Sequence, residues 1–200
     1  APGTQLVFLY LYYAENTGSV NLTQIAKALS LSKATCTRAI NDLSASGLIS
    51  QTAEGTNKWI TTAYTKSELL EKAYGRLKTP VDRILYVKGT AQIERPIASG
   101  IRALARQSMI GVNDQDGAIA ISKKEAAKIP PEDVCTKQYF EDFGGAVIEV
   151  WSYDPTILER DGCVDDISLL LSMDNDPNER VQTCLDEIRQ KHGLPIKEEE

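Results

Sequence analysis

The sequence is poor in the residues that build metal and disulfide sites. It has one histidine, His192, and four cysteines, no two of which form a Cys-x-x-Cys pair. This scatter fits neither a zinc-ligand pattern nor a disulfide framework, so we expect reduced thiols, no metal and no other cofactor. No signal peptide is visible, and no apolar run approaches the ~20 residues that cross a bilayer. We therefore expect a cytoplasmic protein with no membrane partner.

Catalytic signatures are equally scarce. The "SLSK" stretch at residues 30–33 formally matches the Ser-x-x-Lys of serine acyl enzymes, but no partner motif accompanies it. The "DNDPNE" stretch at residues 174–179 begins like a calcium loop, but it has Glu179 where that loop needs glycine. Helix capping explains it better. No nucleophile, base and oxyanion donor assemble, so we expect no enzyme.

Charge is unevenly spread along a chain whose net charge is −6. Residues 1–110 hold 13 Lys or Arg and 7 Asp or Glu, whereas residues 111–200 hold 9 and 21. The front is therefore basic and the back strongly acidic. A basic front favours an anionic partner, with plain surface solvation as the alternative.

Residues 4–16 predict a helix that is apolar in nearly every direction. Such a helix must be covered on more than one side, either between two domains or in a homodimer interface. Because the stretch is rich in aromatic residues, a strand is the competing prediction. The apolar positions are Leu6, Phe8, Leu9, Tyr10, Leu11, Tyr12 and Tyr13.

Two shorter helices follow, joined by a tight turn. In the first, capped by Asn21 or Thr23, one apolar stripe runs through Leu22, Ile25, Ala26 and Leu29. Ser32 is a good N-cap for the second, in which Cys36, Ala39, Ile40 and Leu43 repeat the spacing and Gly47 suits the C-terminal end. Two helices joined in this way form a helix-turn-helix.

The exposed side of residues 32–45 is narrow, small and polar, as a helix in the DNA major groove must be. Small residues let the backbone approach the bases, methyl groups can contact thymine, and Asn or Arg can pair with base edges. The first turn can also hold a phosphate. A plain helical hairpin is the alternative. The predicted DNA-binding residues of this helix are Ser32, Lys33, Ala34, Thr35, Thr37, Arg38 and Asn41, with Ala45 on the same side.

Two β-rich runs come directly after this helix, at residues 48–52 and 59–64, with the turn signal "EGTN" between them. A hairpin in this place makes a winged helix, which we assign to residues 1–64. The wing adds Asn57 and Lys58 to the predicted DNA contacts.

The segment from Ser32 to Ile49 follows the pattern Ser-Lys-x-Thr-x-x-Arg, then Leu, then Gly-Leu-Ile. In this pattern residues 4–64 resemble MarR-type winged-helix regulators. The resemblance implies a bacterial, sequence-specific DNA-binding transcriptional regulator, here a repressor. Wings of that family carry several basic residues, whereas this wing has only Lys58.

The rest of the chain predicts a connecting helix at 65–79 and a mixed α+β domain at 80–200, so the fold class is α+β. A capping box joins Thr65 and Glu68. Asp176 as N-cap with Pro177 at the first position predicts the start of the last helix. Predicted strands lie at 117–122 and 146–153, and predicted helices at 95–110, 166–173 and 177–191.

Three stretches of this domain, "SGIRALARQSMI", "IEVWSYDP" and "VDDISLLLSMDNDPNERVQTCLDEI", together resemble the C-terminal domain of abortive-infection antitoxins of the type IV class. That resemblance implies an autoregulating repressor with a nucleotidyltransferase-like toxin as partner. The competing hypothesis is a winged helix that docks a protein. The polar face with Thr37, Arg38 and Asn41 favours double-stranded DNA.

Overall fold

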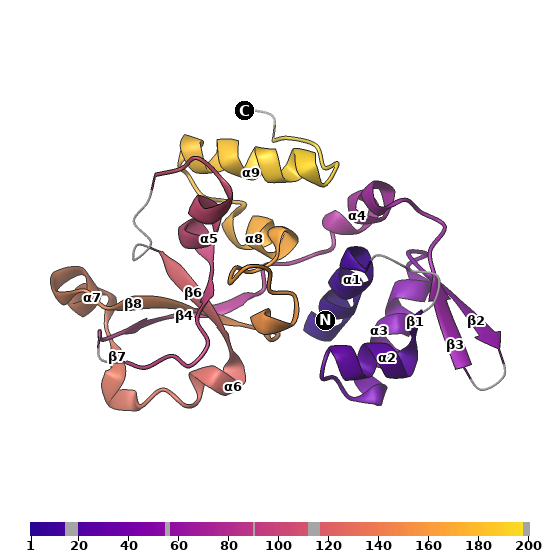
Figure 1. The fold of residues 1–200 in the computed structure, drawn as a ribbon, viewed down its shortest axis with the longest axis horizontal. Coiled ribbons are helices and arrows are strands. Elements are labelled where there is room, and N and C mark those ends of the chain that lie inside the picture. Colours follow the sequence, from indigo (N-terminus) through magenta and orange to yellow (C-terminus); the bar gives the residue numbers. More distant parts are fainter. Residues whose placement is uncertain (15–19, 55–56, 90, 112–116, 198–200) are drawn as a thin grey trace. The chain divides into compact units, whose positions relative to one another are not determined.

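The computed structural model describes residues 1–14, 20–54, 57–89, 91–111 and 117–197 (Figure 1). The chain forms two compact units. The front unit comprises residues 1–77 and 190–196, and the second unit comprises residues 78–189 and 197–200. The predicted domain boundaries at residues 64 and 80 therefore lie before and after the helix Lys66–Tyr74, which belongs to the front unit. None of the helices in the described ranges is long and apolar enough to cross a membrane.

The front unit is built around α1, Pro2–Tyr13. The helix prediction is confirmed over the strand, and six successive or nearly successive side chains are only 0–4% exposed: Leu6, Val7, Phe8, Leu9, Leu11 and Tyr12. α1 contacts α3, Lys33–Ala45, and α4, Lys66–Tyr74. Its apolar side chains are therefore covered within one chain.

In the front unit, predicted capping residues lie at the N-terminal ends of three helices. Asn21, not Thr23, caps α2, Leu22–Ala28, in a reciprocal capping box with Gln24. The Ser32 side chain accepts from the Thr35 N–H at the start of α3. Thr65 and Glu68 form the expected box at α4. α4 ends at Tyr74 rather than at residue 79, because Gly75 follows and the chain is extended on its way to Pro80.

A small antiparallel sheet completes the winged helix. It contains β1, Val20–Asn21, β2, Ser50–Glu54, and β3, Asn57–Thr61, in the order β1-β3-β2. The hairpin is confirmed, with Thr52 opposite Trp59. β1 was not predicted, because two residues are too short to show an alternating pattern.

The segment 190–196 belongs to the front unit, although it follows residues 78–189 of the second unit. His192 Nδ1 lies 2.7 Å from the Tyr12 hydroxyl of α1, and Leu194 is buried. Gly193 has φ +71°, and a Cβ built there would lie 2.1 Å from Ser67 Oγ, so the close approach requires glycine. This segment covers part of α1.

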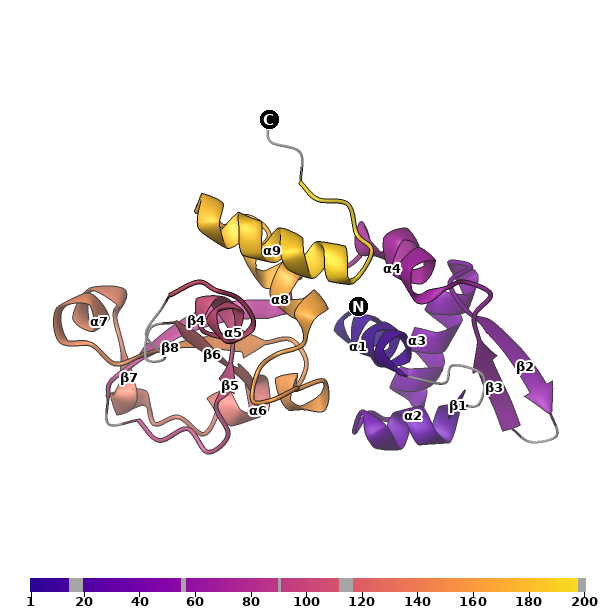
Figure 2. The ribbon, with the colours of Figure 1, turned by 45° about the horizontal axis from the view of Figure 1, so that its top comes forward.

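The second unit is a five-stranded mixed sheet in the order β5-β6-β8-β4-β7. β6 and β8 are parallel, and the other pairs are antiparallel. Figure 2 and Figure 1 show α6 on one side of the sheet and α5 and α8 on the other. The strands are β4, Val81–Val87, β5, Ile97–Ala98, β6, Ala118–Ser122, β7, Val134–Cys135, and β8, Ala146–Trp151. The helices are α5, Gly100–Gln107, α6, Lys123–Ala126, α7, Lys137–Phe143, α8, Asp166–Met173, and α9, Glu179–Lys191, with 3-10 turns at Pro131–Asp133 and Pro155–Ile157.

Two predictions for this unit need correction. The helix expected at 95–110 covers only Gly100–Gln107, because Ile97 and Ala98 pair with β6 as a strand. The last helix begins at Glu179, not 177. Asn178 accepts from the Arg180 N–H there, while Asp176 accepts from the Asn178 N–H in the preceding turn. The mixed α+β fold class is confirmed.

Gly47 should be required at the end of α3. It has φ +74°, and a Cβ built there would meet nothing within 4 Å, so the effect of alanine is purely conformational. We expect Gly47→Ala to lower the free energy of opening of the α3 amides by about 1 kcal/mol in native-state hydrogen exchange. Gly75→Ala is the matched control, because Gly75 has φ −63° in an equally open position. Equal protection in both variants would contradict the requirement.

Candidate nucleic-acid interface

α3 is held by a buried back that fixes which face it presents. Cys36, Ala39, Ile40 and Leu43 are 0–5% exposed, and α3 packs chiefly on α1 and α2. The turn between α2 and α3 is tight: the Leu31 N–H donates to the Ala26 carbonyl at 3.0 Å, and Ser30 has φ +51°. The helix therefore has little freedom to rotate within the front unit.

The side opposite this buried back is exposed. Ala34, Arg38 and Asn41 lie there, with Lys33 and Ser32 exposed at the first turn. Thr37 is half-buried at the edge of this face. The structure thus brings together most of the predicted residues of this helix as one narrow polar surface.

Thr35 occupies a different position from the rest. It is half-buried, and a Cβ built on Gly3 of α1 would lie 3.0 Å from its methyl carbon. Its hydroxyl lies 2.9 Å from that of Ser32, and its N–H donates to the same Ser32 oxygen. The polar atoms of Ser32 and Thr35 are therefore engaged in capping α3. Lys33 remains as the positively charged side chain of the first turn.

Two other side chains of the face hydrogen-bond to their own helix. The Thr37 hydroxyl donates to the Lys33 carbonyl at 2.8 Å, and Arg38 Nε reaches the Ala34 carbonyl at 3.4 Å. The bond from Thr37 is compatible with a methyl contact to a base. The bond from Arg38 is long and exposed, so a stronger acceptor can replace it.

Gln51 joins this surface, although its sequence position gave no sign of it. Gln51 Nε2 donates to Asn41 Oδ1 at 3.3 Å and so links β2 of the wing to α3. The side-chain amide of Asn41 is thereby oriented from the wing side. Because the bond spans two elements, only the folded hairpin reveals it.

The acidic side chain of this helix lies off the presented face. Asp42 Oδ2 accepts from the Thr4 hydroxyl of α1 at 3.1 Å. It therefore lies on the α1 side of α3, about 100° around the helix from Asn41. Repulsion between this carboxylate and a phosphate backbone is reduced accordingly.

The wing residues are only partly described. Asn57 and Lys58 lie on β3 opposite Glu54 and Ala53, but their side chains fall outside the described residues. The turn residues 55–56 also lie outside. The contribution of Asn57 and Lys58 to DNA binding remains a prediction.

The thiol of Cys36 does not take part in chemistry at this surface. The side chain is fully buried, and burial raises its pKa, so it remains a neutral thiol. All four cysteines are free. Within the described ranges, no three or more His, Cys, Asp or Glu side chains are grouped as metal ligands.

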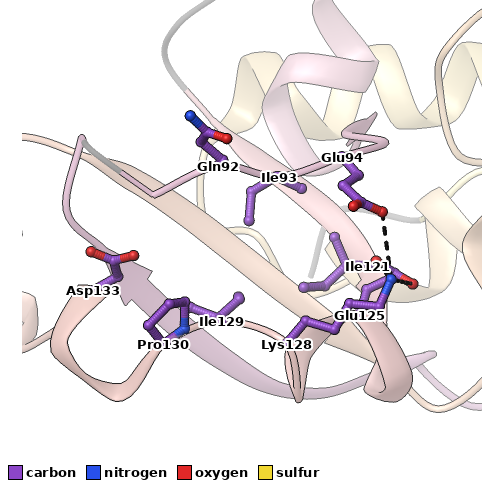
Figure 3. Close-up of a pocket in the computed structure, with 9 residues that line it drawn as sticks. All are labelled: Gln92, Ile93, Glu94, Ile121, Glu125, Lys128, Ile129, Pro130 and Asp133. Carbon is purple, nitrogen blue, oxygen red and sulfur yellow. Dashed lines mark hydrogen bonds and ion pairs between the residues drawn. The ribbon is translucent and has the colours of Figure 1, made fainter.

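The second unit contains a pocket of about 430 Å³, shown in Figure 3. Ile93, Ile121 and Ile129 contribute its apolar surface. At its rim Lys128 lies 2.8 Å from Glu125 and 3.5 Å from Glu94. Lys128, Glu125 and Glu94 are paired with one another. None of these three charges is therefore left unpaired for a ligand in the pocket.

Comparison with known proteins gives one result for this surface. Residues 4–58 match the model of the MarR family, whereas no curated protein and no solved structure matches the chain. The matched residues include most of α1 and all of α2, α3 and β2, the elements that build and position the polar face. Residues 4–58 are therefore similar to the MarR family, and that family implies a DNA-binding transcriptional regulator.

Proposed function

We propose that the chain is a sequence-specific repressor whose α3 lies in the major groove. The observation that carries this proposal is the exposed face with Ala34, Arg38 and Asn41, supported by a fully buried back. Preorganised side chains on a rigid helix can read base edges without the cost of ordering a loop. By occupying an operator, such a protein would block transcription.

The residues have separate roles in this proposal. Arg38 pairs with the acceptor edge of guanine, and Asn41, held by Gln51, pairs with adenine. Ala34 and Thr37 contact thymine methyl groups. Lys33 and the first turn of α3 bind a phosphate, and Asn57 and Lys58 follow the backbone from the wing.

Arg38→Ala should weaken binding to the operator by about 1–3 kcal/mol and relax sequence preference at one base pair. The operator is first selected from a random duplex library with the full chain, and affinities are then measured by fluorescence anisotropy at fixed salt. Arg76→Ala is the matched control, because Arg76 is exposed in the front unit just beyond α4. Similar affinities of the parent and Arg38→Ala would exclude Arg38 from the groove.

A homodimer is the second part of the proposal. Two copies related by a twofold axis place their α3 helices about one DNA turn, ~34 Å, apart, so the selected duplexes should contain an inverted repeat. Because α1 is already covered, the dimer contact must use another surface. Sedimentation of the complex should show two chains per duplex. A single half-site bound by one chain would contradict this arrangement.

One observation favours a protein partner as well. Tyr139 and Phe143 of α7 are 38% and 74% exposed, with ring centroids 4.8 Å apart. Exposed aromatic pairs are common anchors of protein interfaces, and the acidic back half would steer a basic partner. We propose an antitoxin-like role in which this surface binds a toxin-like protein.

The test is co-expression with the product of an adjacent nucleotidyltransferase-like gene. We expect Phe143→Ser to weaken the complex by about tenfold or more, as loss of an aromatic anchor does. Met109→Ser is the control, because Met109 is fully exposed elsewhere in the second unit. If Phe143→Ser leaves the complex intact while Arg38→Ala breaks it, the winged helix itself docks the partner.

A further inference from the structure

Glu149 is a buried carboxyl in the middle of β8, only 8% exposed. Its Oε2 accepts from Trp151 Nε1 at 2.9 Å and from the hydroxyl of Ser99. Ser99 occupies the N-cap position of α5 but makes no side-chain cap bond there. A serine at this position ordinarily caps its helix, so the Ser99 hydroxyl serves Glu149 instead.

The other oxygen of this carboxyl, Oε1, accepts no hydrogen bond from the described residues. Glu149 lines a pocket of about 560 Å³ in the second unit, and a Cβ built on Gly100, which lines the same pocket, would lie 3.5 Å from Oε1. Burial raises the pKa of the carboxyl in spite of its two donors. An apolar residue here would avoid this cost, so packing alone does not explain the carboxyl.

The walls of the pocket supply further negative charge and an apolar surface. Asp174 and Asp176 line it at the C-terminal end of α8, where the helix dipole favours a cation. Asp174 is already paired with Arg189 at 2.5 Å, which leaves Glu149 and Asp176 as the acidic groups for a ligand. Ile101, Leu171 and Met173 provide alkyl contacts.

We propose that this pocket binds an organic ammonium group, with the cation on Glu149 Oε1 and its alkyl chain against the apolar wall. An anion would be repelled by the carboxyl groups of Glu149 and Asp176, and an uncharged alcohol would leave the carboxylate without a counter-charge. Metal ions need several ligands at once, and the described residues are not grouped in that way. The site lies within the second unit and does not rest on the proposed repressor function.

The experiment uses the full chain, labelled with ¹⁵N, and follows the indole N–H signals of its two tryptophans. The Trp151 indole donates to the carboxyl, so it should shift on titration with n-butylammonium, whereas Trp59 on β3 should not. Butanol and butyrate of matched length should leave both signals in place. Equal shifts with all three compounds, or none with butylammonium, would overturn the proposal.

Glu149→Gln tests the counter-charge without emptying the site. Its amide oxygen can accept both existing hydrogen bonds, and its NH₂ group then faces the pocket and repels a cation. We expect butylammonium to bind about 10–100-fold more weakly, as expected for loss of a hydrogen bond to a charged group. Glu125→Gln, at the other pocket, is the matched control. Since Glu149→Gln removes a buried charge, its unfolding midpoint should not fall, which separates lost binding from lost folding.

Two natural sources share this chemistry, a free alkylamine and a lysine side chain of a protein. Nα-acetyl-lysine N-methylamide presents a lysine side chain, with its ammonium group, between two peptide bonds. Tighter binding of butylammonium than of this compound indicates a free amine, and the reverse order indicates a lysine of a partner. Unchanged butylammonium affinity in Glu149→Gln would refute the site for either source.

Discussion

The front unit depends on the need to bury α1 from every side. A side chain such as Leu9 or Phe8 contributes about 1.5–3 kcal/mol when fully buried, and this helix has several of them in succession. Covering them fixes α3 along one side of α1, and α4 and the segment with His192 also contact it. Because α3 uses its apolar stripe for this purpose, its opposite side must face solvent. The orientation of the polar face of α3 is therefore a result of how the core is filled.

The parts that sequence could predict are those set by local rules. Ser32, Asn21 and the Thr65–Glu68 pair begin helices through contacts within three residues, so each was recognisable before folding. The strands β1 and β4 were not recognisable, because each pairs with a strand distant in sequence and β4 does not alternate regularly between buried and exposed residues. The Gln51–Asn41 bond connects two elements whose distance only the fold sets. For the same reason helical periodicity placed the 95–110 helix too early, since pairing with β6 took Ile97 and Ala98 into the sheet.

In the second unit, strand β8 contributes side chains both to the apolar core and to a buried carboxyl group that is costly to desolvate. Ile119, Ile148 and Val150 form the apolar core between the sheet and α6 and are 0–5% exposed. On β8, Glu149 lies between two of these positions and so faces the other side of the sheet, towards α5. There the Glu149 carboxyl is desolvated and accepts a hydrogen bond from the Ser99 hydroxyl, which therefore does not cap α5. Alternation along one strand thus separates the layer that stabilises the unit from the layer suited to binding.

The front unit is made from two stretches of chain separated by residues 78–189 of the second unit. During synthesis α1, α2 and α3 leave the ribosome first, but the partner of Tyr12 follows only after residues 78–189 have been made. At about 5–20 residues per second, that interval is on the order of ten seconds. A chain that stops early would carry α3 yet lack His192 and Leu194 over α1. The order of translation therefore makes the completed front unit a sign that residues 78–189 of the second unit have also been made.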